Sequence, residues 1–189
     1  MSRFKPRRFE VVVVGGLIFG LCFVLMFAFR QARDVKRGEI CQSNMKVIAL
    51  ASKQYERDYD EHFPLSEKWT AGLLPYQRTY KNSTGFRCPT ASEHGYAMNK
   101  HLNGLSPQHL STQNWQQIPQ YFETRKLQDN ASGAGEAWLK KPRHSQGVGV
   151  AFLDGHFEWR QQPPVFHTFA PLPKPKPQKK ARNKNSRRN

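Results

Sequence analysis

The chain has 189 residues, of which 30 are Lys or Arg, 14 are Asp or Glu and three are Cys. The excess of positive charge lies in the flanks, because residues 38–160 hold 14 basic and 12 acidic side chains. This near-neutral central part argues against a basic nucleic-acid-binding domain. The composition also excludes collagen-like, coiled-coil and disulfide-dense proteins, and the length fits one modest domain with additional segments.

Residues 11–29 form an uninterrupted apolar segment of 16 apolar residues and three Gly. As a helix it would be about 28 Å long, close to the ~30 Å hydrocarbon core of a bilayer. A buried soluble helix and a cleaved signal peptide are alternatives, but the segment exceeds a usual signal-peptide core and no small-x-small site follows it. We therefore predict a retained transmembrane helix.

The orientation of this helix is not decided by its flanks, since four Lys or Arg precede the apolar segment and four follow it closely. Two cysteines beyond the segment are able to pair, which favours an oxidising compartment for the following domain. We expect residues 1–10 to form a basic cytoplasmic arm, and the bulk of the chain to lie on the other side.

Residues 30–59 are predicted to extend the same helix. Cys41, Met45, Ile48 and Tyr55 recur on one stripe of an amphipathic pattern. Gly38 is a candidate kink, and Pro64 ends any helical pattern, so the helix should run from about residue 10 to about residue 59. Half of it would lie in lipid and half would pack on a domain.

Residues 60–162 are predicted to form a small head domain. The segment 65–141 is rich in Pro and Gly and should contain loops and short elements, with a strand at 121–124. Three tryptophans are expected to cover a small core: Trp69, Trp115 and Trp138.

The end of the head carries the clearest local signal. Residues 147–153 and 156–159 are β-like and flank Asp154 and Gly155, a pair typical of a two-residue type I′ hairpin turn. Residues 163–189 lose this pattern and become a Pro-, Lys- and Arg-rich tail, predicted to be extended and disordered.

Three segments in order resemble one bacterial family. They are residues 41–64, beginning with Cys41 and ending in Phe63-Pro64; Cys88-Pro89 followed by residues 95–99; and His144 followed after nine residues by Asp154-Gly155. Together they are similar to the pilin-like (pseudopilin, prepilin-type) family with the C-terminal H-X9-DG motif, of the planctomycete and verrucomicrobial kind.

The resemblance implies an α+β fold, in which a long N-terminal transmembrane and amphipathic helix packs on a small antiparallel sheet with a C-terminal hairpin. It implies a single-pass protein of the bacterial inner membrane with a periplasmic head. Its expected partners are the membrane and other pilin-like subunits, as a homo- or hetero-oligomer in a type II secretion or type IV pilus-like assembly.

The N-terminus departs from the prepilin pattern. A prepilin cleavage site has Gly before an aromatic residue or Met and a Glu at the fifth mature position, whereas here Arg8 precedes Phe9 and Glu10 follows it directly. Processing by a prepilin peptidase is therefore not expected. The chain is interpreted as a pilin-like head on a permanent anchor, or as a divergent member of the family.

Cys41 and Cys88 are predicted to form a disulfide that ties the helix to the loop-rich middle of the head. Closing a loop of about 48 residues would stabilise the fold by roughly 4 kcal/mol in the chain-entropy model. Two separate buried thiols are the alternative. Cys22 is interpreted as an apolar residue of the membrane segment.

The motif residues His144, Asp154 and Gly155 are predicted to be structural. Nine extended residues span about 30 Å, so His144 and Asp154 should lie far apart. Asp154 and Gly155 belong to the turn, and His144 is expected to hydrogen-bond a neighbouring loop. A metal site among His144, Asp154 and His156 is the minor alternative.

No catalytic constellation, phosphate loop or zinc spacing is recognisable, so we expect no enzymatic activity, cofactor, metal or small-molecule substrate. Some pseudopilins bind calcium through loop carboxylates, but the acidic cluster Asp58, Asp60 and Glu61 is interpreted as a solvated helix end.

Two functions follow from these features: a structural subunit of a pilus-like assembly or, alternatively, an anchored binding module whose tail holds an anionic envelope polymer or DNA. The tail contacts would come from eight basic residues: Lys174, Lys176, Lys179, Lys180, Arg182, Lys184, Arg187 and Arg188.

Overall fold

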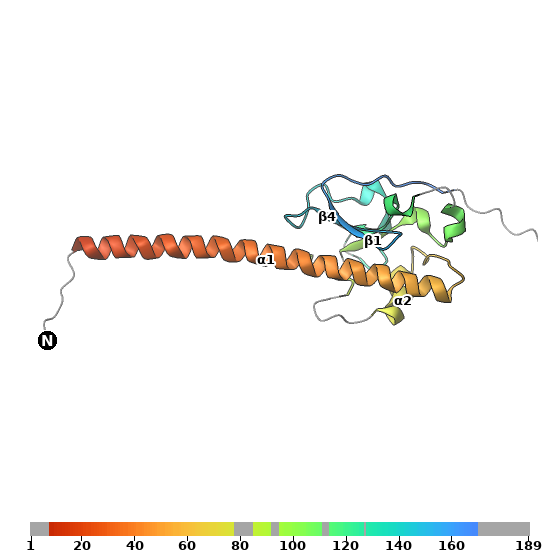
Figure 1. Ribbon diagram of the computed structural model, residues 1–189, viewed down its shortest axis with the longest axis horizontal. Helices are drawn as coiled ribbons and strands as arrows, with labels where there is room; N and C mark the ends of the chain where they lie inside the picture. Colours follow the sequence, from red (N-terminus) through yellow and green to blue (C-terminus); the bar gives the residue numbers. More distant parts are fainter. Residues whose placement is uncertain (1–7, 78–84, 92–94, 111–113, 127, 170–189) are drawn as a thin grey trace, which may run out of the picture.

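The computed structural model of the protein describes residues 8–77, 85–91, 95–110, 114–126 and 128–169. One helix, α1 (Arg8–Asp58), spans the length of the molecule, and a small head packs on its C-terminal half (Figure 1). The helix continues without a break through Gly38. The predicted single helix over residues 10–59 is therefore confirmed.

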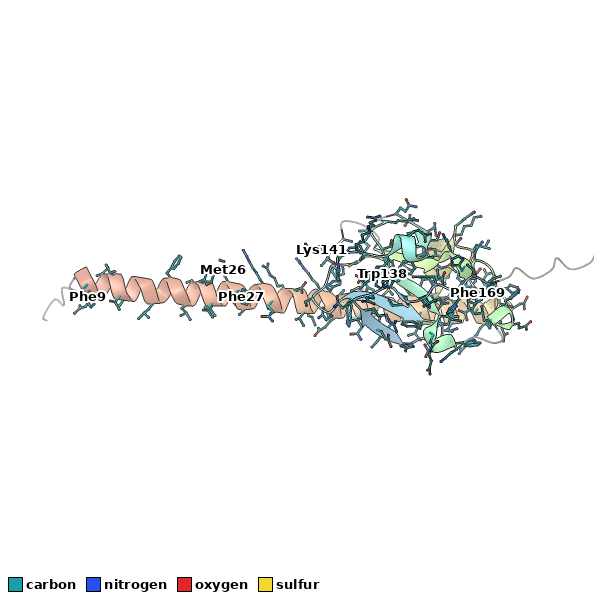
Figure 2. All side chains as sticks on the ribbon, turned by 90° about the horizontal axis from the view of Figure 1, so that it is seen from above. Phe9, Met26, Phe27, Trp138, Lys141 and Phe169 are labelled. Atoms are coloured by element: carbon teal, nitrogen blue, oxygen red, sulfur yellow. The ribbon has the colours of Figure 1, made fainter. Side chains whose placement is uncertain are left out.

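No contact with the described residues buries the side chains of the N-terminal half of α1. Every residue from Phe9 to Phe29 is exposed, Phe9 by 77% and Phe19 by 76%. Figure 2 shows the side chains of this half, among them Met26 and Phe27, projecting from a bare helix. This part is long and apolar enough to cross a membrane.

The C-terminal half of α1 buries the predicted stripe. Cys41, Met45 and Ile48 are fully buried, and Tyr55 is partly buried against the same core. The helix ends in a left-handed turn, with φ of 50° at Asp60 and 60° at Glu61. The N–H of Glu61 donates to the carbonyl of Glu56 at 2.8 Å, which satisfies one of the last free carbonyls of the helix.

The head contains a five-stranded sheet in the order β3-β1-β2-β4-β5. Its strands are β1 (Tyr96–Asn99), β2 (Pro119–Glu123), β3 (Ser132–Gly133), β4 (Val148–Phe152) and β5 (Phe157–Arg160). The β1–β2, β2–β4 and β4–β5 pairs are antiparallel, but the short β3 pairs in parallel with β1. The fold is thus α+β as expected, with a mixed sheet where an antiparallel one was predicted.

The sheet has an apolar layer on each face. One face packs on α1 and on the short helix α2 (Trp69–Leu73), and its core includes Met98 and Tyr121. The other face buries Phe122, Val150 and Phe152, together with other residues, under the segment around Trp138. The alternation of side chains along each strand explains why neighbouring residues such as Tyr121 and Phe122 enter opposite layers.

An irregularity in β2 helps to fix the sheet on α1. The register of β2 with β4 shifts between Pro119 and Tyr121, and two consecutive side chains consequently reach the helix. Nε2 of Gln120 and the hydroxyl of Tyr121 both donate to Oγ of Ser52, at 2.9 and 3.0 Å. Ser52 in turn donates to Glu56 at 3.1 Å.

The tryptophans differ in their burial. Trp69 and Trp138 are buried as predicted, but Trp115 is 41% exposed, and the prediction for this residue is wrong. Trp115 begins a single 3-10 turn, Trp115–Gln117, at the surface, where the ammonium of Lys53 lies 5.8 Å from its ring centroid. Its apolar surface is covered partly by this lysine and not by the core.

The predicted hairpin is confirmed as β4 and β5, but its turn is not the predicted two-residue type I′ turn. Only Gly155 has a positive φ, of 90°, and the N–H of Gly155 donates to the carbonyl of Phe152 at 2.9 Å. The N–H of Phe152 pairs with the carbonyl of His156, so the loop has three residues. In such loops a left-handed Gly follows an ordinary turn, and Asp154 needs no positive φ.

Candidate functional site

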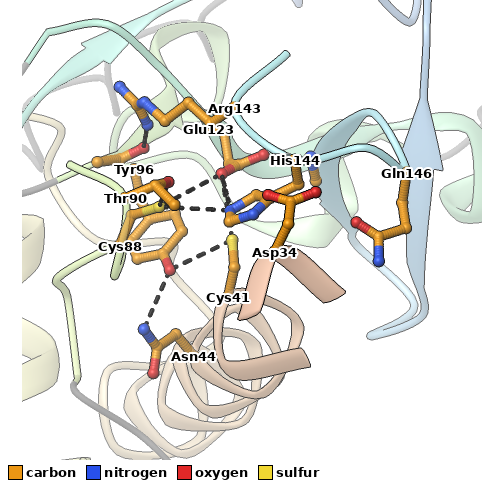
Figure 3. A network of polar contacts seen from close by, with 12 residues as sticks. Asp34, Cys41, Asn44, Cys88, Thr90, Tyr96, Glu123, Arg143, His144 and Gln146 are labelled. Atoms are coloured by element: carbon orange, nitrogen blue, oxygen red, sulfur yellow. Dashed lines mark hydrogen bonds and ion pairs between the residues drawn. The ribbon is translucent and has the colours of Figure 1, made fainter. Parts of the chain in front are cut away.

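Four side chains with metal-ligand chemistry converge between α1 and the sheet. They are Cys41 of α1, Cys88 of the segment 85–91, Glu123 of β2, and His144 of the loop before β4 (Figure 3). One ligand atom from each lies within 4.8 Å of those of the other three. All four residues are buried, and the side chains of Glu123 and His144 are wholly inaccessible to solvent.

The carboxylate of Glu123 is the centre of this cluster. Its Oε1 accepts from Sγ of Cys41 at 3.2 Å, and lies 3.6 Å from Sγ of Cys88 and 3.3 Å from Nε2 of His144. Its Oε2 accepts a 2.7 Å hydrogen bond from the backbone N–H of Gly149 in the adjacent strand. One oxygen is therefore fixed by the sheet while the other faces the sulfurs and the imidazole.

The fold brings the histidine onto the helix through a close approach of its loop to α1. The N–H of Ser145 donates to Oδ2 of Asp34 at 3.2 Å. A Cβ at Gly38 would lie 2.8 Å from Oε1 of Gln146, so the absence of a side chain at Gly38 lets this loop lie against the helix. Gly38 is thus a contact point and not the kink that was a candidate in the sequence.

A second layer of polar groups holds Cys41 and Cys88. The hydroxyl of Tyr96 donates to Sγ of Cys41 at 3.4 Å, and Nδ2 of Asn44 donates to that hydroxyl at 3.1 Å. Nδ2 of Asn44 also donates to the carbonyl of Arg87 at 2.7 Å, which ties the segment before Cys88 to the helix. The hydroxyl of Thr90 lies 3.1 Å from Sγ of Cys88.

Arg143 places a positive charge beside the cluster. Its guanidinium donates to the carbonyls of Gly95, at 3.2 Å, and of Thr124. A Cβ at Gly95 would lie 2.7 Å from Cβ of Cys88 and 3.1 Å from Nη1 of Arg143, so these two side chains are close neighbours. The cation partly compensates the negative charge of the buried acidic groups.

Burial and mutual hydrogen bonding shift the pKa values of the cluster. Burial raises the pKa of the Cys41 thiol well above its usual value, and its contacts with Cys88 and Glu123 add to the rise. The hydrogen bond from Cys41 is the largest effect that lowers the pKa of Cys88, to about 3. Burial of the His144 ring opposes protonation, but Cys88 and Glu123 outweigh it and raise its pKa to about 9.

Only one nitrogen of His144 has polar partners in the described part of the chain. Nε2 lies 3.6 Å from Sγ of Cys88 and 3.3 Å from Glu123, whereas the buried Nδ1 has no hydrogen-bond partner. The ring packs edge-on against Trp159, with centroids 5.5 Å apart. The ring is therefore held with Nε2 toward the Cys88 sulfur and the Glu123 carboxylate.

The structure corrects one prediction about these residues. Cys41 and Cys88 are free thiols and not a disulfide, although the two sulfurs lie in one cluster and not in separate places. His144 contacts a neighbouring loop as expected, since its Nε2 lies 3.6 Å from Sγ of Cys88 in the segment 85–91, and the same nitrogen lies 3.3 Å from Glu123 of β2. The expected absence of any metal-ligand cluster overlooked Glu123, which sequence spacing alone does not connect with the other three residues.

The remaining predicted site residues lie elsewhere. Oδ1 of Asp154 accepts from the N–H of His156 at 3.1 Å, as expected for a turn aspartate, and Asp154 pairs with His156 and not with His144. Asp58 accepts a 2.6 Å hydrogen bond from Tyr76, and Asp60 and Glu61 are exposed where α1 ends. The eight basic tail residues, Lys174 to Arg188, lie outside the described residues.

No family model matches the chain, and no curated protein or solved structure is significantly similar to it.

Proposed function

We propose that the protein is a membrane-anchored, pilin-like structural subunit of a type II secretion or type IV pilus-like assembly in a bacterial inner membrane, with its head in the periplasm. One observation carries this proposal. The N-terminal half of α1 is a fully exposed apolar rod, continuous with a helical half that forms part of the core of the head.

The exposed rod requires an apolar environment. Residues 11–29 lie on every side of the helix without partners in the described chain, and such a surface is far larger than a monomeric soluble protein leaves in water. A bilayer satisfies all sides of the rod at once, because the backbone polar groups are already paired within the helix. Equivalent rods of neighbouring subunits are the second environment that suits this surface.

The short distance between the rod and the head supports an arrangement in which the head rests at the membrane surface. The apolar segment ends at Phe29, and the first contact with the head is made by Asp34. Five helical residues rise only about 8 Å. The basic residues Arg30, Arg33, Lys36 and Arg37 would then lie at the level of the lipid headgroups, where long basic side chains can extend to water.

Anchoring is tested by fractionating cells that produce the full-length chain. We expect the protein to remain in membranes after alkaline carbonate extraction and to leave them only with detergent. Protease added to spheroplasts should digest the head. Release of the protein into the aqueous phase, or protection of the head until the cells are lysed, would contradict the proposal.

Assembly is tested by placing a photo-crosslinking amino acid at Leu17, which is 70% exposed on the apolar rod. Crosslinks between copies, or to other apolar-helix subunits, are expected in membranes. The matched control is the same probe at Leu65, which is 53% exposed on the head. If the chain is anchored but forms no crosslink from Leu17, the membrane anchor remains supported and the role as a subunit is excluded.

The composition of the tail favours a second candidate, an anchored binding module for an anionic envelope polymer or DNA. Residues 171–189 carry eight basic side chains and no acidic one. Deleting these residues should abolish retention of such a polymer, and retention by the full chain should fall steeply with salt. Salt-insensitive retention, or retention without the tail, would exclude this function.

A further inference from the structure

We propose that Cys41, Cys88, Glu123 and His144 bind one Zn²⁺ ion, in a closed tetrahedral site that joins α1 to the head. This inference concerns the interior of the head and does not depend on whether the protein is anchored in a membrane or assembles with other subunits. It rests on the convergence of four buried donor atoms from four different segments.

The spacing of the donor atoms suits a four-coordinate ion. Four of the six separations are 3.2, 3.3, 3.6 and 3.6 Å, and the remaining two are within 4.8 Å. An ion at the centre of a tetrahedron with edges of about 3.4 Å would lie about 2.1 Å from each donor, against typical values of ~2.3 Å for Zn–S and ~2.0–2.2 Å for Zn–N and Zn–O. Small side-chain shifts are sufficient to complete the site.

The chemistry of the donors selects zinc over the commoner hard cations. Two sulfurs and an imidazole nitrogen are poor ligands for Mg²⁺ and Ca²⁺, which require sets of oxygen ligands. Zn²⁺ accepts sulfur, nitrogen and carboxylate oxygen together. With four protein ligands and no solvent access, the site leaves no position for a substrate, so its role is structural and not catalytic.

Surrounding groups support three of the four ligands, while Nδ1 of His144 has no partner among the described residues. Gly149 holds the second oxygen of Glu123, and Tyr96 and Thr90 contact the two sulfurs. Two thiolates and a carboxylate around Zn²⁺ leave one net negative charge, and the guanidinium of Arg143 lies beside Cys88 to offset it. Zn²⁺ binds two thiolates, a carboxylate and a neutral imidazole, so any protons that these four groups carry are released to solvent on binding.

The site would do what the predicted disulfide was expected to do. It ties the helix, through Cys41, to three segments of the head that contain few regular elements. A metal cross-link of this kind contributes directly to folding stability, because the unfolded chain does not preform the site. The head would then be most stable in its zinc-bound form.

The test uses the full-length chain, purified in detergent under reducing conditions and without a metal-chelating resin. Elemental analysis should find about one zinc per chain, as expected for a single structural site. After removal of the metal, titration with Co²⁺ should produce thiolate-to-cobalt charge-transfer absorption and the visible bands of a tetrahedral complex. Zn²⁺ should abolish these bands and raise the thermal unfolding midpoint. The cobalt spectrum reports thiolate ligation and tetrahedral geometry without any substitution and therefore does not depend on whether a variant folds.

Variants assign the ligands. Cys88→Ser and His144→Ala should lose the stoichiometric zinc, and Glu123→Gln should bind it more weakly while keeping an acceptor for Gly149. Two matched controls should retain one zinc per chain: Cys22→Ser, since Cys22 is exposed on the apolar half of α1, and His156→Ala, since His156 pairs with Asp154 away from the cluster.

Reduced wild-type protein that binds neither Co²⁺ nor Zn²⁺ would overturn the proposal. So would a Cys88→Ser variant that folds and keeps its zinc, or a chain isolated with a Cys41–Cys88 disulfide that takes up no metal after reduction.

Discussion

The backbone N–H of Gly149 donates a 2.7 Å hydrogen bond to Oε2 of Glu123, across the pair formed by β2 and β4. This bond joins β4, the strand that precedes the Asp154-Gly155 turn, to a buried carboxylate of β2. A Cβ at Gly149 would lie 3.0 Å from the ring of Phe157, so the absence of a side chain there leaves room for that ring of β5. His144 and the strand that follows it thus contact the same glutamate.

Replacing Glu123 by Ala should destabilise even the metal-free protein. The substitution leaves the N–H of Gly149 and the ring of His144 buried without their acceptor, which should cost about 2–4 kcal/mol of unfolding free energy. Glu123→Gln should cost less, because an amide oxygen can still accept from Gly149. Thermal unfolding followed by tryptophan fluorescence, with chelator present, compares the two variants. Equal losses for both would show that the hydrogen bond to Gly149 does not contribute.

Ser52→Ala should weaken the attachment of the sheet to α1. Oγ of Ser52 accepts from Gln120 and from Tyr121, and its removal leaves the Tyr121 hydroxyl without its acceptor while Gln120 keeps its 3.1 Å hydrogen bond to Glu56, so the substitution should cost about 1–3 kcal/mol. Tyr121→Phe removes one donor and keeps the ring in the core, and should cost about 1 kcal/mol. Lys46→Ala, on an exposed side of the same helix, is the control and should stay within ~0.5 kcal/mol of wild type. A Ser52→Ala protein as stable as the control would contradict this account of the β2 irregularity.

A substitution at Gly155 in the hairpin turn measures the cost of backbone strain without a steric clash. A Cβ at Gly155 would meet nothing within 4 Å, yet φ is 90° there, so Gly155→Ala should cost about 1 kcal/mol or more through the backbone alone. Gly135→Ala is the matched control, because its Cβ would only touch Phe166 at 4.0 Å and its φ is not positive. Chemical unfolding of both variants measures the difference. If both glycines tolerate alanine equally, the three-residue turn does not need its left-handed position.

The parts of the fold that local patterns determine were predictable. The apolar segment and the amphipathic stripe after it indicated one helix to about residue 59. The pair Asp154-Gly155 between β-like segments indicated the hairpin. The strand predicted at 121–124 corresponds to β2, which covers Pro119–Glu123. In each case the signal lies within a few residues, where spacing or turn chemistry decides the structure.

The parts that depend on tertiary pairing were not predictable. β1 is buried along its whole length and shows no alternation, and β3 has only two residues. The cluster requires β2 to lie between β1 and β4 and the loop of His144 to approach Gly38. No local sequence pattern predicts either of these tertiary arrangements. Glu123 was therefore missed, although an acidic residue ending a mostly apolar strand is itself a signal, because buried carboxylates require partners.

A charge placed in the middle of the apolar rod should release the protein from membranes. Leu21 is 60% exposed near the centre of residues 11–29, and Leu21→Lys should raise the free energy of insertion by about 3 kcal/mol. Val35→Lys is the matched control, because Val35 is 41% exposed on the same helix beyond the apolar segment, among basic residues. Carbonate extraction of cells should leave the control in the membrane fraction and move a large share of the Leu21→Lys protein to the soluble fraction. The head lies outside the rod, so the unfolding midpoint of both variants in detergent should match that of the wild type. Equal membrane retention of the two variants would mean that the rod is not embedded in lipid, and that another apolar surface covers it.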